Sequence, residues 1–139
     1  MTSIWASAPT TTAKTIRIVL VDDAGAVRRA LRLTLSVEPD LSVVGEAADG
    51  ARAVQLARDL HPDIILMDLE LPGINGLDAA QQIKAAGERG AIIMLTAFGG
   101  EQIRGAAARA GIALFLEKGD DLADLAETIR TLHDRTNRT

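Results

Sequence analysis

Short runs of apolar residues alternate along the chain with longer segments in which apolar and polar residues recur at helical spacing. The apolar runs predict five strands, at residues 16–21, 42–47, 64–67, 91–95 and 113–116. The segments between and after them predict five helices, at 27–37, 51–60, 77–86, 101–110 and 122–133. Turn-forming pairs such as Asn75-Gly76 separate these segments. The pattern therefore predicts five consecutive strand–helix units.

Helical periodicity is strongest in the last predicted helix and weakest in the fourth. In the last one, apolar residues recur along one face at Leu122, Leu125, Ala126, Ile129 and Leu132. In the first predicted helix, Arg28, Arg29 and Arg32 are expected on the solvent side. The fourth has Ile103 as its one large apolar residue. We therefore expect a loosely held helix there.

Repeated strand–helix units with short loops predict a parallel sheet with right-handed crossovers and helices on both faces. For five strands we expect the doubly wound, flavodoxin-like order 2-1-3-4-5, with its switch point between strands 1 and 3. Residues 1–14 have turn-type composition and no periodicity, which predicts a flexible tail. Residues 15–133 then form one α/β domain, and residues 134–139 a short C-terminal tail.

Charged and hydroxyl residues follow four of the predicted strands. Asp22 and Asp23 follow the first strand, Asp68 the third, Thr96 the fourth and Lys118 the fifth. Taken singly, such residues are more often helix caps or solvated side chains than parts of a site. Here they converge, because the carboxyl ends of parallel strands share the edge where open α/β sheets bind ligands. Carboxylates gathered there call for a hard cation, a basic side chain, or both.

This set of side chains suits phosphoryl transfer. Carboxylate oxygens of Asp22, Asp23 and Asp68 are ligands that Mg²⁺ or Mn²⁺ prefers. Asp68 could attack phosphorus in line as a carboxylate nucleophile and form an aspartyl phosphate. Lys118 would balance the charge of the phosphoryl group, and the Thr96 hydroxyl could donate a hydrogen bond to it. No general base is needed, because an ionised carboxylate is already nucleophilic.

Composition narrows the function further. The 139 residues, 47% of them hydrophobic, fit one domain with a proper core. A net charge of −4 argues against direct binding of nucleic acid, which requires a basic face. The absence of cysteine excludes disulfides and thiolate metal sites and suits a reducing compartment. No apolar run approaches a membrane span, and residues 1–14 lack a signal peptide, so we expect a cytoplasmic protein that does not contact membranes.

Four segments resemble response-regulator receiver domains, in particular those of the NarL/FixJ-type class. They are VLVDD at 19–23, VGEAADG at 44–50, PDIILMDLELPGING at 62–76 and MLTA at 94–97. The resemblance runs from about residue 16 to residue 132. It implies a two-component phosphorelay in which Asp68 accepts a phosphoryl group from a sensor histidine kinase or a phosphotransfer protein. It also implies that Asp22, Asp23, Asp68 and the backbone carbonyl of Glu70 hold Mg²⁺ or Mn²⁺.

The same resemblance implies a switch built from Thr96, whose hydroxyl turns toward the phosphoryl group, and Phe115, whose ring fills the space vacated. Lys118 is implied as the ammonium that pairs with the phosphoryl group. The chain departs from the family pattern at several positions. Phenylalanine replaces the commoner tyrosine at 115, alanine follows the aspartate pair at 24, and Lys118-Gly119 replaces a Lys-Pro bond that is often cis. Glu70 adds an acid close to the phosphoryl group.

The sequence leaves two alternatives for how such a receiver would pass on its signal. Regulators of the resembled class continue into a DNA-binding helix-turn-helix, and no such pattern follows Leu132. We expect either a stand-alone receiver that docks onto a downstream protein, which is favoured, or a receiver cut from a longer transcriptional regulator. Switching could also control a homodimer. In each case the chemistry is limited to self-phosphorylation and self-dephosphorylation, and the chain is not expected to be an enzyme.

Three alternatives compete with this interpretation. A degenerate receiver would bind proteins without being phosphorylated, although competent residues fill all the site positions. A flavin-binding protein of similar fold is poorly supported, because tyrosine is absent and no hydroxyl-rich phosphate loop follows the first strand. A hydrolase with an aspartate nucleophile would carry it after the first strand with another aspartate two positions on. Here Asp23 is followed by Ala24 and Gly25.

Overall fold

A five-stranded parallel sheet forms the centre of the chain in a computed structural model that describes residues 15–97, 105–106, 108–119 and 122–136. The strand order is β2-β1-β3-β4-β5, which confirms the predicted flavodoxin-like order. The strands are β1 (Ile16–Val21), β2 (Leu41–Ala47), β3 (Ile64–Asp68), β4 (Ala91–Thr96) and β5 (Leu114–Glu117). All neighbouring strands pair in parallel, as repeated strand–helix units require.

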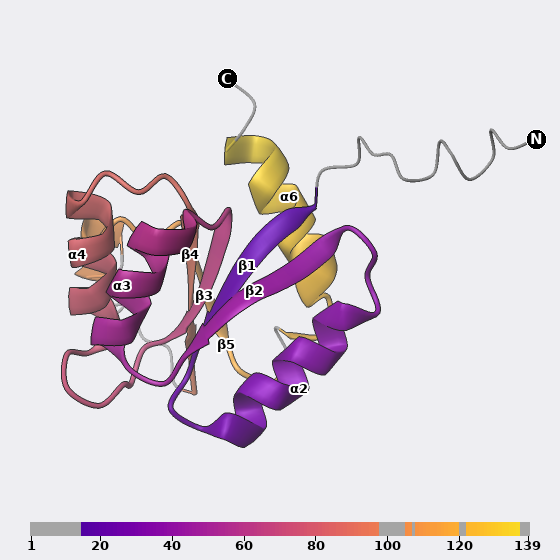
Figure 1. The fold of residues 1–139 in the computed structure, drawn as a ribbon, viewed down its shortest axis with the longest axis horizontal. Coiled ribbons are helices and arrows are strands. Elements are labelled where there is room, and N and C mark those ends of the chain that lie inside the picture. Colours follow the sequence, from indigo (N-terminus) through magenta and orange to yellow (C-terminus); the bar gives the residue numbers. More distant parts are fainter. Residues whose placement is uncertain (1–14, 98–104, 107, 120–121, 137–139) are drawn as a thin grey trace, which may run out of the picture.

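Helices cover both faces of this sheet. They are α2 (Gly25–Ser36), α3 (Gly50–Leu60), α4 (Gly76–Ala85) and α6 (Leu125–Thr136). Figure 1 shows α3 and α4 on one face and α2 and α6 on the other. Within the described ranges, no helix is both long and apolar enough to cross a lipid bilayer.

The described residues contain four bounded helices rather than the predicted five. The predicted helix at 101–110 falls mostly outside the described residues, although residues 105–106 and 108–109 are helical. The predicted tail at 1–14 also lies outside them. The last helix begins at Leu125 rather than at 122, because Leu122 lies in a turn and its amide donates to the Gly119 carbonyl at 3.1 Å.

The core is divided by the sheet into two apolar layers. Strands β3 and β4 are buried along their whole length, as expected of central strands with helices on both sides. Strand side chains facing α3 and α4 are Val19, Val21, Ile65, Met67, Ile92 and Met94. Those facing α2 and α6 are Ile18, Leu20, Ile64, Leu66, Ile93 and Leu95. Because side chains alternate along a strand, this double burial fixes the register of every central strand.

Register brings the ends of the strands to one edge, which lies toward the bottom of the view in Figure 1. Asp68 pairs with Leu95, and Thr96 pairs with Glu117. Backbone hydrogen bonds extend the pairing beyond the strand ends. The amide of Asp22 donates to Ala47 at 3.0 Å, and the amide of Lys118 donates to Thr96 at 2.7 Å. The sheet therefore holds the main chain of the polar strand-end residues in place.

Candidate functional site

Three carboxylates meet at the carboxyl edge of the sheet. One oxygen from each of Asp22, Asp23 and Asp68 lies within 4.8 Å of the others. Asp22 is 2% exposed and Asp68 6% exposed, whereas Asp23 is exposed to solvent. Two buried carboxylates and one accessible carboxylate thus form a cluster that opens to solvent on the side of Asp23.

Local turns orient the two buried carboxylates. Asp22 Oδ1 accepts a hydrogen bond from the Ala24 amide at 2.9 Å, and Asp68 Oδ1 accepts one from the Glu70 amide at 3.2 Å. Both bonds reach two residues along the chain, a turn that aspartate side chains commonly form. In each residue the other oxygen, Oδ2, is directed toward the lysine described next. The backbone of Glu70 is held beside Asp68 by the same contact, although its side chain is exposed.

Lys118 connects the two buried carboxylates. Its Nζ lies 3.1 Å from Asp22 Oδ2 and 3.3 Å from Asp68 Oδ2. The side chain projects from the end of β5 and reaches across the end of β4. Within the described residues every peptide bond is trans, including the bond from Lys118 to Gly119. One ammonium therefore contacts two of the three carboxylates, and the cluster retains an excess of negative charge.

The environment shifts the ionisation of the paired groups. Burial raises the pKa of Asp68, and the negative charge of Asp22 raises it further. The hydrogen bond from the Glu70 amide and the charge of Lys118 lower this pKa, but the net shift is upward. Burial lowers the pKa of Lys118, but Asp22 and Asp68 together outweigh it, so the net pKa lies above the usual value for lysine. The ammonium is held in its charged form, while burial, with the charge of Asp22 as a smaller contribution, disfavours ionisation of Asp68. An added cation would balance the excess of negative charge in the cluster.

The residues present fit a small divalent cation. Mg²⁺ and Mn²⁺ take hard oxygen ligands and typically bind through one or two carboxylates plus phosphate oxygens and water. Asp22, Asp23 and Asp68 offer such oxygens at close range, with one of the three open to solvent. The donor set contains no sulfur or imidazole within the described residues. These features favour a hard cation over a soft one.

Thr96 and Phe115 lie near the same edge, on β4 and β5. Thr96 is 2% exposed at the end of β4. Phe115 pairs with Met94, two residues before Thr96 in the strand, and packs partly buried against the core layer that faces α3 and α4. Because side chains alternate along a strand, Thr96 and Met94 project to the same face. Thr96 and Phe115 thus share one layer of the molecule.

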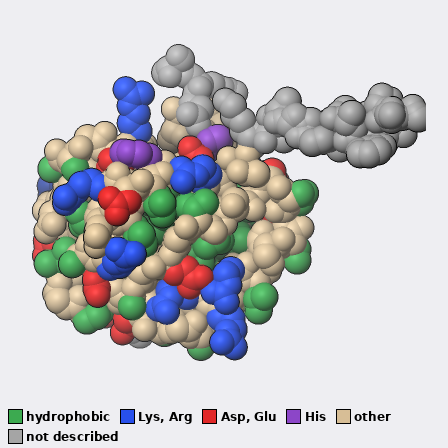
Figure 2. Space-filling view, in the orientation of Figure 1, with side chains coloured by type: hydrophobic (Ala, Val, Ile, Leu, Met, Phe, Trp, Pro, Cys, Tyr) green, Lys and Arg blue, Asp and Glu red, His purple; other side chains and the backbone are tan. Residues whose placement is uncertain are grey.

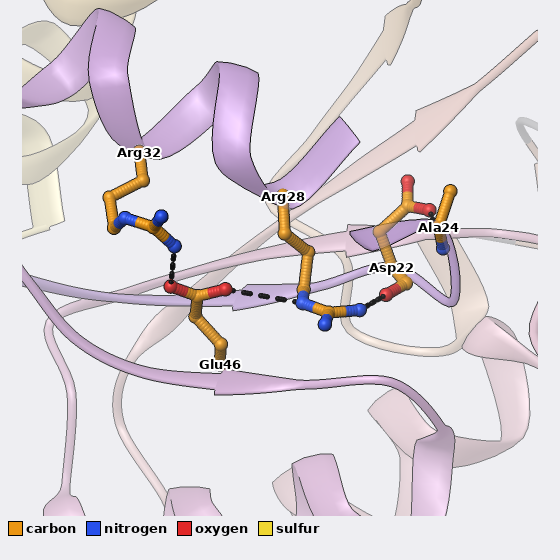
Figure 3. Close-up of polar contacts among 5 residues, drawn as sticks. All are labelled: Asp22, Ala24, Arg28, Arg32 and Glu46. Atoms are coloured by element: carbon orange, nitrogen blue, oxygen red, sulfur yellow. Dashed lines mark hydrogen bonds and ion pairs between the residues drawn. The ribbon is translucent and has the colours of Figure 1, made fainter. Parts of the chain in front are cut away.

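An arginine contact that the sequence did not suggest supports Asp22 from the other side. Arg28 Nη1 donates to the backbone carbonyl of Asp22 at 2.6 Å. Arg28 Nε and Arg32 Nη1 donate to Glu46 of β2, at 3.2 Å and 2.5 Å (Figure 3). The prediction that Arg28 lies on the solvent side of the helix was wrong, because its side chain turns toward the sheet and is only 22% exposed. Arg32 also reaches Glu46, but its side chain stays 42% exposed, as the prediction requires. Arg29 is exposed, as predicted.

Both histidines lie at the opposite end of the sheet, away from the carboxylates. His61 and His133 line a surface hollow together with Asp63 and Glu88, close to the amino ends of β3 and β4. His61 Nδ1 lies 2.9 Å from Glu88 Oε1. Figure 2 shows histidine side chains on this end of the molecule. The hollow shares no residue with the carboxylate cluster, so the two features are separate.

Sequence comparisons with a family model and with curated proteins point to the same family. The family model for the response regulator receiver domain matches residues 18–130. The transcriptional regulatory protein LiaR of Bacillus subtilis is 40% identical over 115 residues, covering 83% of this chain and 54% of LiaR. The nitrate/nitrite response regulator protein NarL of Escherichia coli K12 is 33% identical over 112 residues, covering 81% and 52%. The chain spans about half the length of these curated relatives.

Solved structures give the same result. A two-component response regulator of the LuxR family from Aurantimonas sp. SI85-9A1 superposes with a TM-score of 0.83 at 35% identity, covering 88% of this chain and 87% of that one. The response regulator domain of Thermotoga maritima CheB superposes with a TM-score of 0.81 at 33% identity, covering 87% and 98%. The chain belongs to the receiver-domain family of two-component response regulators, and its relatives are of the NarL/LuxR class.

Proposed function

We propose that this receiver accepts a phosphoryl group on Asp68 from a sensor histidine kinase or a phosphotransfer protein, in a reaction that depends on Mg²⁺ or Mn²⁺. The observation that carries the proposal is the meeting of Asp68 with two further carboxylates and with Lys118 at one edge of the sheet. Lone strand-end carboxylates are common, but this combination of hard oxygens, one buried nucleophile and one ammonium suits phosphoryl transfer.

The transfer step needs little covalent chemistry from the protein. An oxygen of Asp68 forms a bond to phosphorus as the bond from phosphorus to the donor imidazole nitrogen breaks, and the electron pair of that bond stays on the nitrogen. Burial of Asp68 makes its ionised carboxylate more basic and therefore more nucleophilic. A cation held by Asp22, Asp23, Asp68 and the Glu70 carbonyl would neutralise charge on the phosphoryl oxygens.

Lys118 and Thr96 would then stabilise the product. Phosphorylation gives Asp68 a charge of about −2 and several strong acceptor oxygens. Lys118, already 3.3 Å from Asp68, would pair with those oxygens. The Thr96 hydroxyl would turn toward them, and Phe115 would move into the space beneath. These movements shift the population between two packings of one layer of the domain.

The shifted packing would alter a surface that docks onto another protein. Its occupant would be a downstream target, an output domain of the same protein or a second copy of this receiver. Nucleic acid and membranes are not proposed as direct partners of this domain, which we place in the cytoplasm. Its own chemistry would be limited to gaining and losing the phosphoryl group, so it would act as a signalling component rather than an enzyme.

The proposal is tested with acetyl phosphate and Mg²⁺, followed by intact-protein mass spectrometry. The wild-type chain should gain one phosphoryl group, and Asp68→Ala should gain none. Asp59→Ala, which removes an exposed carboxylate of α3, should behave as the wild type. No gain in the wild type, or a gain that survives Asp68→Ala, would contradict the proposal. No gain in the wild type would favour a degenerate receiver that binds proteins without phosphorylation.

A further inference from the structure

Figure 3 shows a branched polar contact between α2 and β2, formed by the side chains of Arg28, Arg32 and Glu46. It extends to the backbone carbonyl of Asp22, a residue of the carboxylate cluster. Glu46 accepts hydrogen bonds from Arg28 Nε and from Arg32 Nη1. Arg28 alone continues toward the cluster, because its Nη1 donates to the backbone carbonyl of Asp22 at 2.6 Å. Arg32 shares the Glu46 contact and does not reach Asp22.

The Arg28 contact completes the support of the main chain at Asp22. The amide of Asp22 is bound by Ala47 of β2 at 3.0 Å, and its carbonyl is bound by Arg28 of α2. The two peptide groups that flank Asp22 are therefore each held by one hydrogen bond, and the plane between Asp22 and Asp23 is held through its carbonyl by Arg28. Since Asp23 follows that plane directly, the direction of its exposed side chain depends on it. Within the described residues no hydrogen bond or ion pair fixes the Asp23 carboxylate itself.

The geometry of the guanidinium explains how a cation can support a cation site. Arg28 binds a carbonyl oxygen and leaves the carboxylate oxygens of Asp22 and Asp23 available for a metal ion. Its charge is balanced by Glu46, and both side chains are half-buried, at 22% and 26% exposure. A guanidinium is planar and carries its donors in a fixed fork, so one contact through Nε orients the other through Nη1. An ammonium has no such fork and could not hold both partners in one plane.

We propose that Arg28, oriented by Glu46, is a positioning residue that sets the Asp22–Asp23 pair for the divalent cation. This inference rests on the proposed function, because it concerns the same cation site. Partners that orient metal ligands typically change metal affinity by about 10- to 100-fold when removed. Loss of the Arg28 contact should therefore weaken cation binding by about 10-fold or more, while the protein remains folded.

The test measures binding of Mn²⁺ alone, by the electron paramagnetic resonance signal of the free ion, in the full chain. Arg28→Ala should raise the Kd by about 10-fold or more, and Arg28→Lys should raise it similarly, because lysine keeps the charge but loses the fork. The matched control is Arg32→Ala, which also cuts a Glu46 contact and should change the Kd by less than about twofold.

A second measurement reports on positioning without any metal. Hydrogen exchange at the Ala24 amide, which is bound to Asp22 Oδ1, should speed up in Arg28→Lys and stay unchanged in Arg32→Ala. Equal effects of Arg28 and Arg32 variants on Kd would overturn the inference, because the contact would then be a general clamp between α2 and β2. A wild-type Kd retained in Arg28→Lys would also overturn it.

The two proposals fail in different ways. If the wild type gains a phosphoryl group and the Arg28 variants bind Mn²⁺ with the wild-type Kd, only the positioning role is lost. If the wild type gains no phosphoryl group but the Arg28 variants still weaken Mn²⁺ binding, the cation site stands and phosphorylation fails. If the wild type binds no Mn²⁺, the positioning role is wrong together with the cation site.

Discussion

Lys118 Nζ lies 3.3 Å from Asp68 Oδ2, and this contact joins the ends of two strands that are not neighbours in the sheet. The same ammonium lies 3.1 Å from Asp22 Oδ2. Lys118 therefore lies between the two buried carboxylates, where it would also contact a phosphoryl group on Asp68. Lys118 should therefore stabilise the unphosphorylated protein, and this effect can be measured apart from its pairing with a phosphoryl group.

Replacing Lys118 should destabilise the protein when no divalent cation is present. Lys118→Met leaves two buried carboxylates, Asp22 and Asp68, without their shared positive charge. Breaking a buried pair costs about 3–5 kcal/mol, but Lys118 is 28% exposed, so we expect about 1–2 kcal/mol. Urea unfolding in the presence of a chelator measures the loss, and added Mg²⁺ should restore part of it.

A double variant provides the control for Lys118. Asp68→Asn removes one of the carboxylates that Lys118 neutralises, so Lys118→Met should cost less in that background than in the wild type. Equal costs in both backgrounds would show that the Lys118–Asp68 contact contributes nothing to stability.

Asp23 should matter for cation binding and not for the stability of the cation-free protein. Its carboxylate is exposed and adds repulsion to the cluster, so Asp23→Asn should leave cation-free stability unchanged or slightly higher. Mg²⁺ at about ten times its Kd should stabilise the wild type by about 1.4 kcal/mol. Asp23→Asn should lose most of this gain at the same Mg²⁺ concentration, measured by urea unfolding. Asp59→Asn on α3 should keep it.

Sheet order and the meeting of the strand-end residues could be predicted from the sequence because both follow from periodicity. Continuous apolar runs such as that of β3 imply burial on both faces, and parallel strands put their carboxyl ends on one edge. Asp68 ends its strand, and Asp22 and Lys118 follow theirs directly, so sheet geometry brings them together. Nothing about their contacts depends on long loops.

The Arg28 contact could not be predicted in the same way. Helical periodicity places an arginine off the apolar stripe, but its long side chain can still fold back along the helix to a buried partner. The partner, Glu46, is a half-buried acid next to the carboxyl end of β2, and its position beside α2 depends on tertiary packing. Two arginines spaced by four residues, with an acid in the following strand, are the one sequence signal for this contact, and that pattern alone does not separate it from a solvated helix face.

Gly76 should be intolerant of even one added carbon. A Cβ at this position would lie 2.5 Å from the carbonyl oxygen of Asp68 and 3.0 Å from Leu69 Cα, both main-chain atoms. Alanine has the better helix propensity by at most about 1 kcal/mol, whereas overpacking costs about 1–3 kcal/mol. We therefore expect Gly76→Ala to lower the free energy of unfolding by about 1–2 kcal/mol.

Gly25 provides the matched comparison at the start of another helix. A Cβ there would have its nearest contact at 3.7 Å, from Arg28 Nη2, which is an ordinary distance. Gly25→Ala should change stability by less than about 0.5 kcal/mol. A Gly76→Ala variant as stable as Gly25→Ala, in the same urea titration, would show that the chain after β3 can move away.

The way in which the stability of the protein changes at acidic pH should depend on Arg130. This residue of α6 binds Asp40 with Nε 2.7 Å from Oδ2, and also binds Glu38. The hydrogen bond from Arg130 holds the pKa of Asp40 below its usual range. A carboxyl whose pKa is lowered in the folded state stabilises the protein at pH values above its unfolded pKa of about 3.9. This contribution is lost as the pH falls through the folded-state pKa.

Arg130→Gln should therefore reduce the urea midpoint at pH 7 and at pH 5 equally, with the difference from wild type shrinking below about pH 3.9. The effect should be small and weaken in high salt, because both side chains contact water. A difference that persists undiminished in strong acid would assign the role of Arg130 to packing instead of charge.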